Sequence, residues 1–101
     1  MNICKVKGNV VSTNKSERLN GLKLMLVSEV DIKTGKEKNV QYVAIDTVGA
    51  GEGEIVLVVS GSSSRQTEMT ENKPIDAAII GIIDYVEIEG TTVFEKYKPN
   101  K

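Results

Sequence analysis

The sequence contains no histidine and no tryptophan, and it has a single cysteine, Cys4. One cysteine cannot form a disulfide within the chain, and without histidine the usual ligand sets for zinc and iron cannot be assembled. The same absence removes the Ser-His and Cys-His pairs of nucleophilic enzymes. We therefore expect no metal, no cofactor and a reducing compartment.

Long hydrophobic runs are also missing. No apolar stretch is long enough to cross a bilayer. At the N-terminus, Lys5 and Lys7 interrupt the apolar residues where a signal peptide would need a continuous run. The sequence therefore predicts a cytoplasmic location and no contact with a membrane.

The chain also has no large excess of positive or negative charge. Thirteen basic and fourteen acidic residues leave a net charge of -1, which provides no general attraction to nucleic acid. The two signs are unevenly placed, because residues 1–45 sum to +4 and residues 46–101 sum to -5. A solvated surface is the simple interpretation. Opposite charges on opposite flanks, which would help copies of the chain to meet head to tail, are the alternative.

What the sequence does contain is alternation with a period of two residues. Cys4, Val6, Gly8 and Val10 fall on one side of an extended segment whose other side is polar, which is typical of a half-buried strand. Similar segments, separated by polar or glycine-containing turns, predict further strands at residues 22–27, 39–48, 54–60, 79–89 and 92–97.

Two segments differ from simple alternation. Residues 54–60, EIVLVVS, form a continuous β-branched run, which predicts burial on both faces of the strand, against a sheet or a neighbouring subunit. Residues 74–78 begin with proline and include two alanines, so we expect one short helical turn there.

These elements predict an all-β fold. A chain of 101 residues is too short to divide into two stable cores, so we expect one domain over residues 1–101. A small closed OB-like β-barrel of about five strands, with one short helical turn, avoids exposed strand edges. A β-sandwich is the alternative.

The GAGEG segment, which contains Gly49, Gly51 and Gly53, is similar to a phosphate-binding loop in composition. Such loops lead from a strand into a helix, whose N-terminal N–H groups meet the phosphates. Here a strand follows, and Glu52 and Glu54 would repel phosphate. We therefore interpret the three glycines as a structural turn between strands, with positive φ at one or more of them.

The second polar motif, GSSSR, contains Gly61, Ser62, Ser63, Ser64 and Arg65. Consecutive hydroxyls beside an arginine can hydrogen-bond an anion. A polar turn at the end of a strand explains the same residues. The motif is our candidate for a surface that faces a ligand or a pore.

Catalytic and nucleic-acid-binding interpretations are weaker. Asp46 and Asp84 lie among apolar strand residues and could form an acid/base pair, but a carboxylate that accepts backbone N–H bonds at a turn is the simpler explanation. Cys4 shares the apolar side of its strand and fits a core residue better than a nucleophile. A barrel that binds single-stranded nucleic acid needs aromatic platforms, and the chain has only four aromatic residues.

Several segments in a fixed order carry a resemblance to a known family. They are KVxGxVVST from Lys5, LxGxKLMLV from Leu19, VAIDTVGAGEGEIVL from Val43, GSSSR from Gly61 and PIDAAIIGIID from Pro74. Together they closely resemble the EutN/CcmL family, the vertex proteins of bacterial microcompartment shells and carboxysomes. The likeness runs from about Lys5 to Asp84. The family's serine motif is usually closer to GSSAR, so Ser64 is a conservative departure.

The resemblance implies a non-enzymatic structural protein. It implies an OB-like barrel that assembles into a homopentamer and caps the fivefold corners of a polyhedral shell, where it meets hexameric shell proteins. On this interpretation Gly61 to Arg65 lie near the ring axis or at a subunit contact, and the protein uses neither a cofactor nor nucleic acid.

Overall fold

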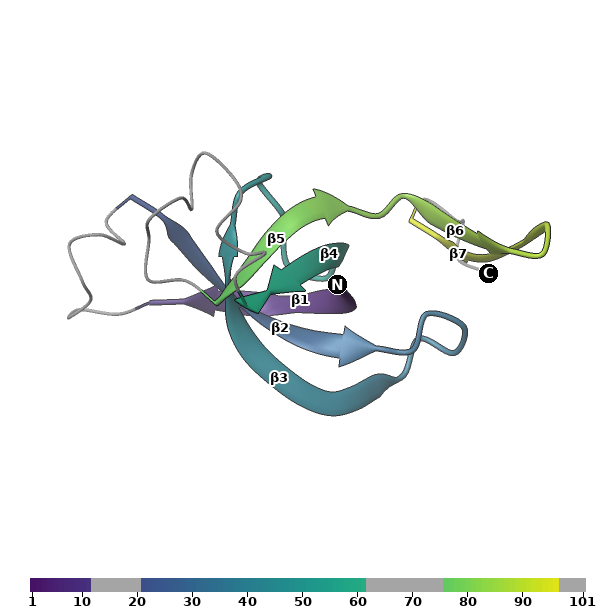
Figure 1. Ribbon diagram of the computed structural model, residues 1–101, viewed down its shortest axis with the longest axis horizontal. Coiled ribbons are helices and arrows are strands. Elements are labelled where there is room, and N and C mark those ends of the chain that lie inside the picture. The colour runs from purple at the N-terminus through teal and green to yellow at the C-terminus, as the bar shows by residue number, and fades with distance from the viewer. Residues whose placement is uncertain (12–20, 62–75, 97–101) are drawn as a thin grey trace.

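The computed structural model describes residues 1–11, 21–61 and 76–96. Within these ranges the chain forms seven β-strands and no α-helix (Figure 1). The strands are β1 (Asn2–Val10), β2 (Lys23–Val30), β3 (Glu37–Asp46), β4 (Ile55–Ser60), β5 (Ala77–Ile82), β6 (Tyr85–Ile88) and β7 (Thr91–Glu95). Nothing helical in the described part of the chain has the length and apolar character of a membrane span.

Five strands close into a barrel in the order β1-β2-β3-β5-β4, with β4 pairing back to β1. All neighbours are antiparallel except β3 and β5, which are parallel and pair only at Ile45 with Ala78 and at Asp46 with Ile79. The prediction of a small closed OB-like barrel is therefore confirmed. The β6–β7 hairpin forms a separate two-stranded sheet.

The alternating pattern places one face of each strand inside the barrel. On β1, Cys4 and Val6 are fully buried while Lys5 and Lys7 lie outside, as the sequence predicts. The core is made of ten buried side chains: Cys4, Val6, Met25, Val27, Ala44, Ala50, Val56, Val58, Ala77 and Ile79. Nine of these ten residues lie in the five barrel strands, and where a strand contributes two of them they are two positions apart. β-Branched residues suit this pleated, buried surface.

The outer surface of the barrel is also partly apolar. On β2 the inward residues are Met25 and Val27, so Leu24 and Leu26 lie outside and are only half-buried. On β4, Val56 and Val58 are fully buried and Ile55 and Leu57 are partly exposed. The β4 run is thus apolar on both faces, but the chain by itself covers only the inner face completely.

Two sequence predictions are corrected at the end of the barrel. The long strand predicted at residues 79–89 is divided into β5 and β6, because the chain leaves the barrel sheet at Ile83 and Asp84. The predicted helical turn at residues 74–78 is not found at Ala77 and Ala78, which begin β5; Pro74 and Ile75 lie outside the described residues. Pairing with β4, at Ala77 with Ser60, outweighs the weak helical preference of alanine.

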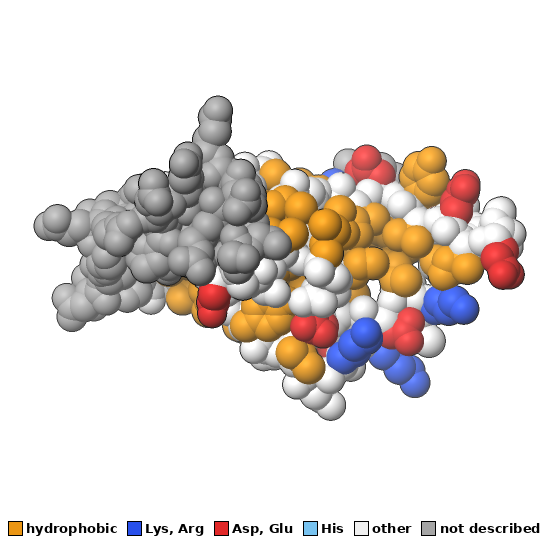
Figure 2. Space-filling view, in the orientation of Figure 1, with side chains coloured by type: hydrophobic (Ala, Val, Ile, Leu, Met, Phe, Trp, Pro, Cys, Tyr) orange, Lys and Arg blue, Asp and Glu red, His pale blue; other side chains and the backbone are white. Residues whose placement is uncertain are grey.

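The C-terminal hairpin extends the molecule along its long axis (Figure 1). The principal extents of the chain are 45 × 24 × 23 Å. In the space-filling view, hydrophobic side chains form a band that runs from the barrel to the hairpin (Figure 2). The hairpin contributes no residue to the buried core, so the barrel interior is complete without it.

Ile79 provides a test of the core. Its side chain is fully buried at the parallel junction of β3 and β5, and Ile79→Ala should lower the free energy of unfolding by about 2–5 kcal/mol because it leaves a cavity. Urea unfolding at a fixed protein concentration measures the change. Val11→Ala is the control, since Val11 is 90% exposed, and equal loss in both variants would contradict the assigned core.

Candidate functional site

Asp46 is a turn residue and not half of an acid/base pair. It is 5% exposed, and its Oδ1 accepts hydrogen bonds from the backbone N–H groups of Val48 and Gly49, both at 3.0 Å. The neighbouring Thr47 donates its Oγ1 hydrogen to the carbonyl of Ile79 at 2.7 Å. These hydrogen bonds hold the chain at the point where it leaves β3, and they connect this point to β5.

Asp84 lies away from Asp46. It is exposed and lies five residues beyond Ile79, the residue that pairs with Asp46. At the rise of a strand this separation is roughly 16 Å. Two carboxylates at this distance cannot share a substrate bond as acid and base, so the structure favours the simpler interpretation of both residues.

The glycine segment forms a tight connection between β3 and β4. Gly49 and Gly53 have φ values of 80° and 88°, which agrees with the turn predicted from the sequence. Gly51 has a different role, because its N–H donates to Glu54 Oε1 at 2.6 Å. The N–H of Gly53 donates to the carbonyl of Val6 at 2.8 Å.

These contacts exclude a phosphate cradle at the described glycines. The N–H groups of Gly49, Gly51 and Gly53 already donate to acceptors of the chain, and β4 follows where a phosphate loop would start a helix. Ala50, between two of the glycines, is buried in the core. The segment therefore shapes the barrel and does not present free donors to a ligand.

Glu54 joins this turn to the C-terminal hairpin. One carboxylate oxygen accepts the N–H of Gly51, and the other forms an ion pair with Lys96 Nζ. The Lys96 ammonium, and then the Gly51 N–H, hold the pKa of Glu54 below its ordinary value of 4.5. Sequence reasoning missed this role, because the partner lies 42 positions away and no local pattern indicates it.

Cys4 is a core residue with a polar neighbour. Its side chain is fully buried, and its Sγ lies 3.4 Å from Tyr42 Oη. Burial raises the pKa of the Cys4 thiol, which makes the thiolate scarce. Asn2 Nδ2 donates to the same Tyr42 oxygen at 3.1 Å, and burial also raises the pKa of Tyr42.

The serine motif is only partly within the described residues. Gly61 has a φ of 64°, and its N–H donates to the carbonyl of Asp76 at 2.8 Å. Residues 62–65, which comprise Ser62, Ser63, Ser64 and Arg65, lie outside the described ranges. The role of this motif therefore stays a prediction.

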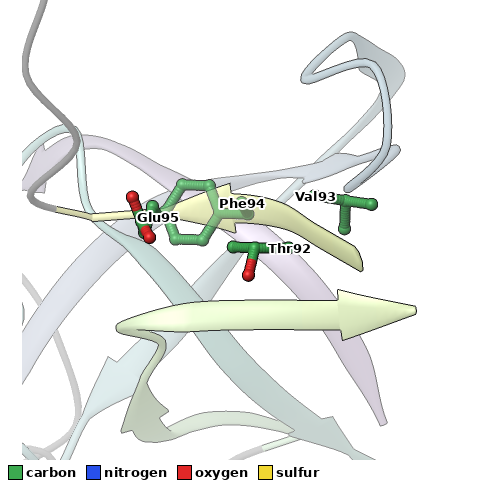
Figure 3. Close-up of a pocket in the computed structure, with 4 residues that line it drawn as sticks. All are labelled: Thr92, Val93, Phe94 and Glu95. Carbon is green, nitrogen blue, oxygen red and sulfur yellow. The ribbon is translucent and has the colours of Figure 1, made fainter. Parts of the chain in front are cut away.

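One small hollow and one larger, open hollow lie on the described surface. The hollow drawn in Figure 3 measures about 120 Å³ and is lined by four consecutive residues of β7, Thr92 to Glu95, whereas small-molecule sites usually enclose roughly 300–1,000 Å³ with convergent groups. A larger open hollow of about 470 Å³ lies beside Lys5, Lys7 and Glu52. Among residues 1–11, 21–61 and 76–96, no group of three potential ligands could hold a metal ion.

Fold and site together define a class of protein. The described chain is a small closed barrel with a partly apolar outer surface, and its polar residues hold turns and hairpins in place. This arrangement is typical of a module that acts through contacts with other proteins.

Comparisons with known proteins identify the family. Residues 1–84 match the family model described as "Ethanolamine utilisation protein EutN/carboxysome", so the chain belongs to the EutN/CcmL family, and the resemblance seen in the sequence is confirmed. It is 49% identical to the microcompartment shell vertex protein GrpN of Rhodospirillum rubrum over 86% of this chain and 97% of that protein. It is 43% identical to the vertex protein EutN of Salmonella typhimurium over 95% and 96%.

Solved structures of vertex proteins also match the fold of this chain. The structure of CcmL from Gloeobacter violaceus matches with a TM-score of 0.90 at 39% identity, covering 97% of this chain and all of that chain. GrpN, which is described as a pentameric microcompartment shell protein, matches with a TM-score of 0.75 at 45% identity, covering 87% and 98%.

The two aspartates provide a second prediction. Asp46→Ala should lower the free energy of unfolding by about 1–3 kcal/mol, because two backbone donors lose their acceptor. Urea unfolding measures the loss. Asp84→Ala is the matched control and should change stability by less than about 0.5 kcal/mol, because Asp84 is exposed. Equal effects of the two substitutions would contradict the structural role of Asp46.

The Glu54 ion pair provides a prediction about pH. Because the pKa of Glu54 is lower in the folded chain, its stabilisation is complete above about pH 4.5 and is lost as the pH falls through the lowered pKa. Wild type should therefore exceed Glu54→Gln in free energy of unfolding at pH 7, and this advantage should shrink as the pH is lowered below 4.5. Glu52→Gln is the control. A difference between wild type and Glu54→Gln that stays constant from pH 7 to pH 3 would contradict the ion pair.

Proposed function

We propose that the protein is a structural component of a bacterial microcompartment shell, located in the cytoplasm, where five copies form a ring that caps a fivefold vertex. The observation that carries this proposal is the likeness, over most of both chains, to vertex proteins at 39–49% identity. One of these relatives, GrpN, is described as pentameric. Residues 1–101 act as one functional unit in this proposal.

The outer surface of the barrel supports assembly. Ile55 and Leu57 on β4 are partly exposed, and Val43 on β3 is 41% exposed. A barrel of 101 residues has a limited core, so burial of these apolar side chains against neighbouring copies would add stability that one copy lacks. A five-membered ring requires contacts between two different flanks of the subunit.

The mechanism in this proposal is geometric. A subunit shaped as a wedge closes the ring, and the rim of the ring meets flat hexameric shell proteins and introduces curvature at the corner. Gly61 to Arg65 lie near the ring axis or at a subunit contact in this arrangement. Gly49, Gly51 and Gly53 hold the turn that shapes the subunit.

Neither catalysis nor nucleic-acid binding is part of the proposal. Among the described residues, the arrangement of Asp46, Asp84 and Cys4 does not support a catalytic centre, and no cofactor is needed for a geometric role. Single-stranded nucleic acid requires a row of exposed aromatic side chains. Of the three aromatic residues in the described ranges, Tyr42 packs against the core, Phe94 is half-buried and only Tyr85 is largely exposed.

Native mass spectrometry at low micromolar concentration tests the proposal. The expected species is a pentamer of about 55 kDa, five times the chain mass of 11.0 kDa. The same sample at low salt should show no binding to a single-stranded oligonucleotide. A predominant monomer or dimer would count against the vertex role, and salt-sensitive binding of the oligonucleotide would revive the nucleic-acid alternative.

A further inference from the structure

Two hairpins extend from the same end of the barrel. One, here called the basic hairpin, is residues 31–40 between β2 and β3; the other, here called the acidic hairpin, is residues 84–96 with β6 and β7. They lie on either side of the N-terminal end of β1 (Figure 1). Lysine and acidic side chains gather at this end of the molecule (Figure 2).

The basic hairpin carries three exposed lysines without ion-pair partners. Lys33, Lys36 and Lys38 are exposed, and none forms an ion pair within the described part of the chain. Glu37, the one glutamate of this hairpin, is already bound to Lys7 at 2.7 Å. The hairpin also exposes an apolar residue, Val40, which is 44% accessible.

The acidic hairpin has the complementary character. Glu87, Glu89 and Glu95 are exposed and form no ion pair with any described residue. Its lysine, Lys96, is already bound to Glu54. Tyr85 is 60% exposed and pairs directly with Glu95 across the two strands, so an aromatic ring lies beside carboxylates, an arrangement that attracts ammonium groups.

The two sets of charges do not meet within one chain. A hollow of about 420 Å³ separates the hairpins, with Lys33 and Lys38 on one wall, Ile88 on the other, and the first residues of β1 on its floor. An exposed charge contact is weak by itself. Here three lysines of the basic hairpin and three glutamates of the acidic hairpin lack ion-pair partners among the described residues, and Asp31, the other acid of the basic hairpin, accepts the backbone N–H of Lys33. Their complementarity therefore fits a contact between copies.

The position of both hairpins at one end of the barrel suits a closed ring. In a ring generated by pure rotation, the two contacting surfaces must lie at the same height along the axis, since a difference in height produces an open helix. The two hairpins lie at one end of the barrel, on either side of the N-terminal end of β1, and satisfy this condition when the ring axis follows the long axis of the molecule (Figure 1).

We propose that the acidic hairpin of one copy docks on the basic hairpin of the next copy around the ring. This inference rests on the proposed pentamer and names one of its contacts. The match to the family model ends at residue 84, where the acidic hairpin begins. The contribution of this hairpin is to strengthen the ring and fix its direction, rather than to create the barrel.

Charge reversal in the full chain tests the contact. Glu87→Lys in the acidic hairpin and Lys36→Glu in the basic hairpin should each raise the concentration at which half of the rings dissociate by about tenfold, because five weak contacts are lost together. Glu52→Lys and Lys23→Glu are matched controls at exposed positions outside both hairpins and should change it less than about twofold. Native mass spectrometry on dilution gives the readout.

Mixing the two variants separates contacts between chains from contacts within a chain. At the contact between positions 36 and 87, Glu87→Lys chains present two lysines and Lys36→Glu chains present two glutamates. Only junctions between unlike chains therefore bring opposite charges together at these positions. A ring of five cannot alternate completely, and the most resistant rings should contain the chains in a 3:2 or 2:3 ratio. One variant is labelled with ¹⁵N so that the compositions are resolved.

The outcomes are distinct. If wild-type chains form rings and the charge-reversal variants dissociate at the same concentration as the controls, the hairpin contact is overturned and the vertex role stands. If mixed rings resist dilution no better than rings of either variant alone, the attraction between positions 36 and 87 acts within one chain. This result also overturns the hairpin contact between copies. Absence of a wild-type pentamer would instead remove the proposed function.

Discussion

The short parallel pairing between β3 and β5 is the contact on which the barrel depends. Only Ile45 with Ala78 and Asp46 with Ile79 join these strands, and every other junction in the barrel is an antiparallel ladder of at least four residue pairs. Thr47 adds a side-chain hydrogen bond to Ile79, and Asp46 holds the turn that follows. This short junction therefore has side-chain support in addition to its ladder, and without it two strand edges would be exposed.

Much of this architecture could be predicted from the sequence, and the reason is the alternation of residues. Inward positions such as Cys4 and Val6 are separated by lysines, and this pattern fixes both the strand and its buried face. Gly49 and Gly53 could be assigned to a turn because a strand follows them and acids surround them. The family resemblance depended on the order of several such segments rather than on any one of them.

The errors lay where long-range contacts outweigh local preference. Ala77 and Ala78 favour a helix locally, but β4 pairs with both residues and draws them into the sheet. The break between β5 and β6 falls at Ile83 and Asp84, and neither residue is a proline or glycine that would indicate a strand end. Glu54 appeared only as an acid that repels phosphate, since its bond to Lys96 joins segments that are distant in the sequence.

The two oxygens of Glu54 have a mechanical consequence. One holds the turn at Gly51 and the other holds Lys96 at the end of the hairpin, while the backbone of Glu54 accepts the N–H of Val6 on β1. Force applied to the C-terminal hairpin is therefore transmitted through the Glu54 side chain to the β3–β4 turn and to β1, and not along the backbone alone. At a shell vertex, this connection lets tension at the rim of the ring be shared by the barrel of each subunit.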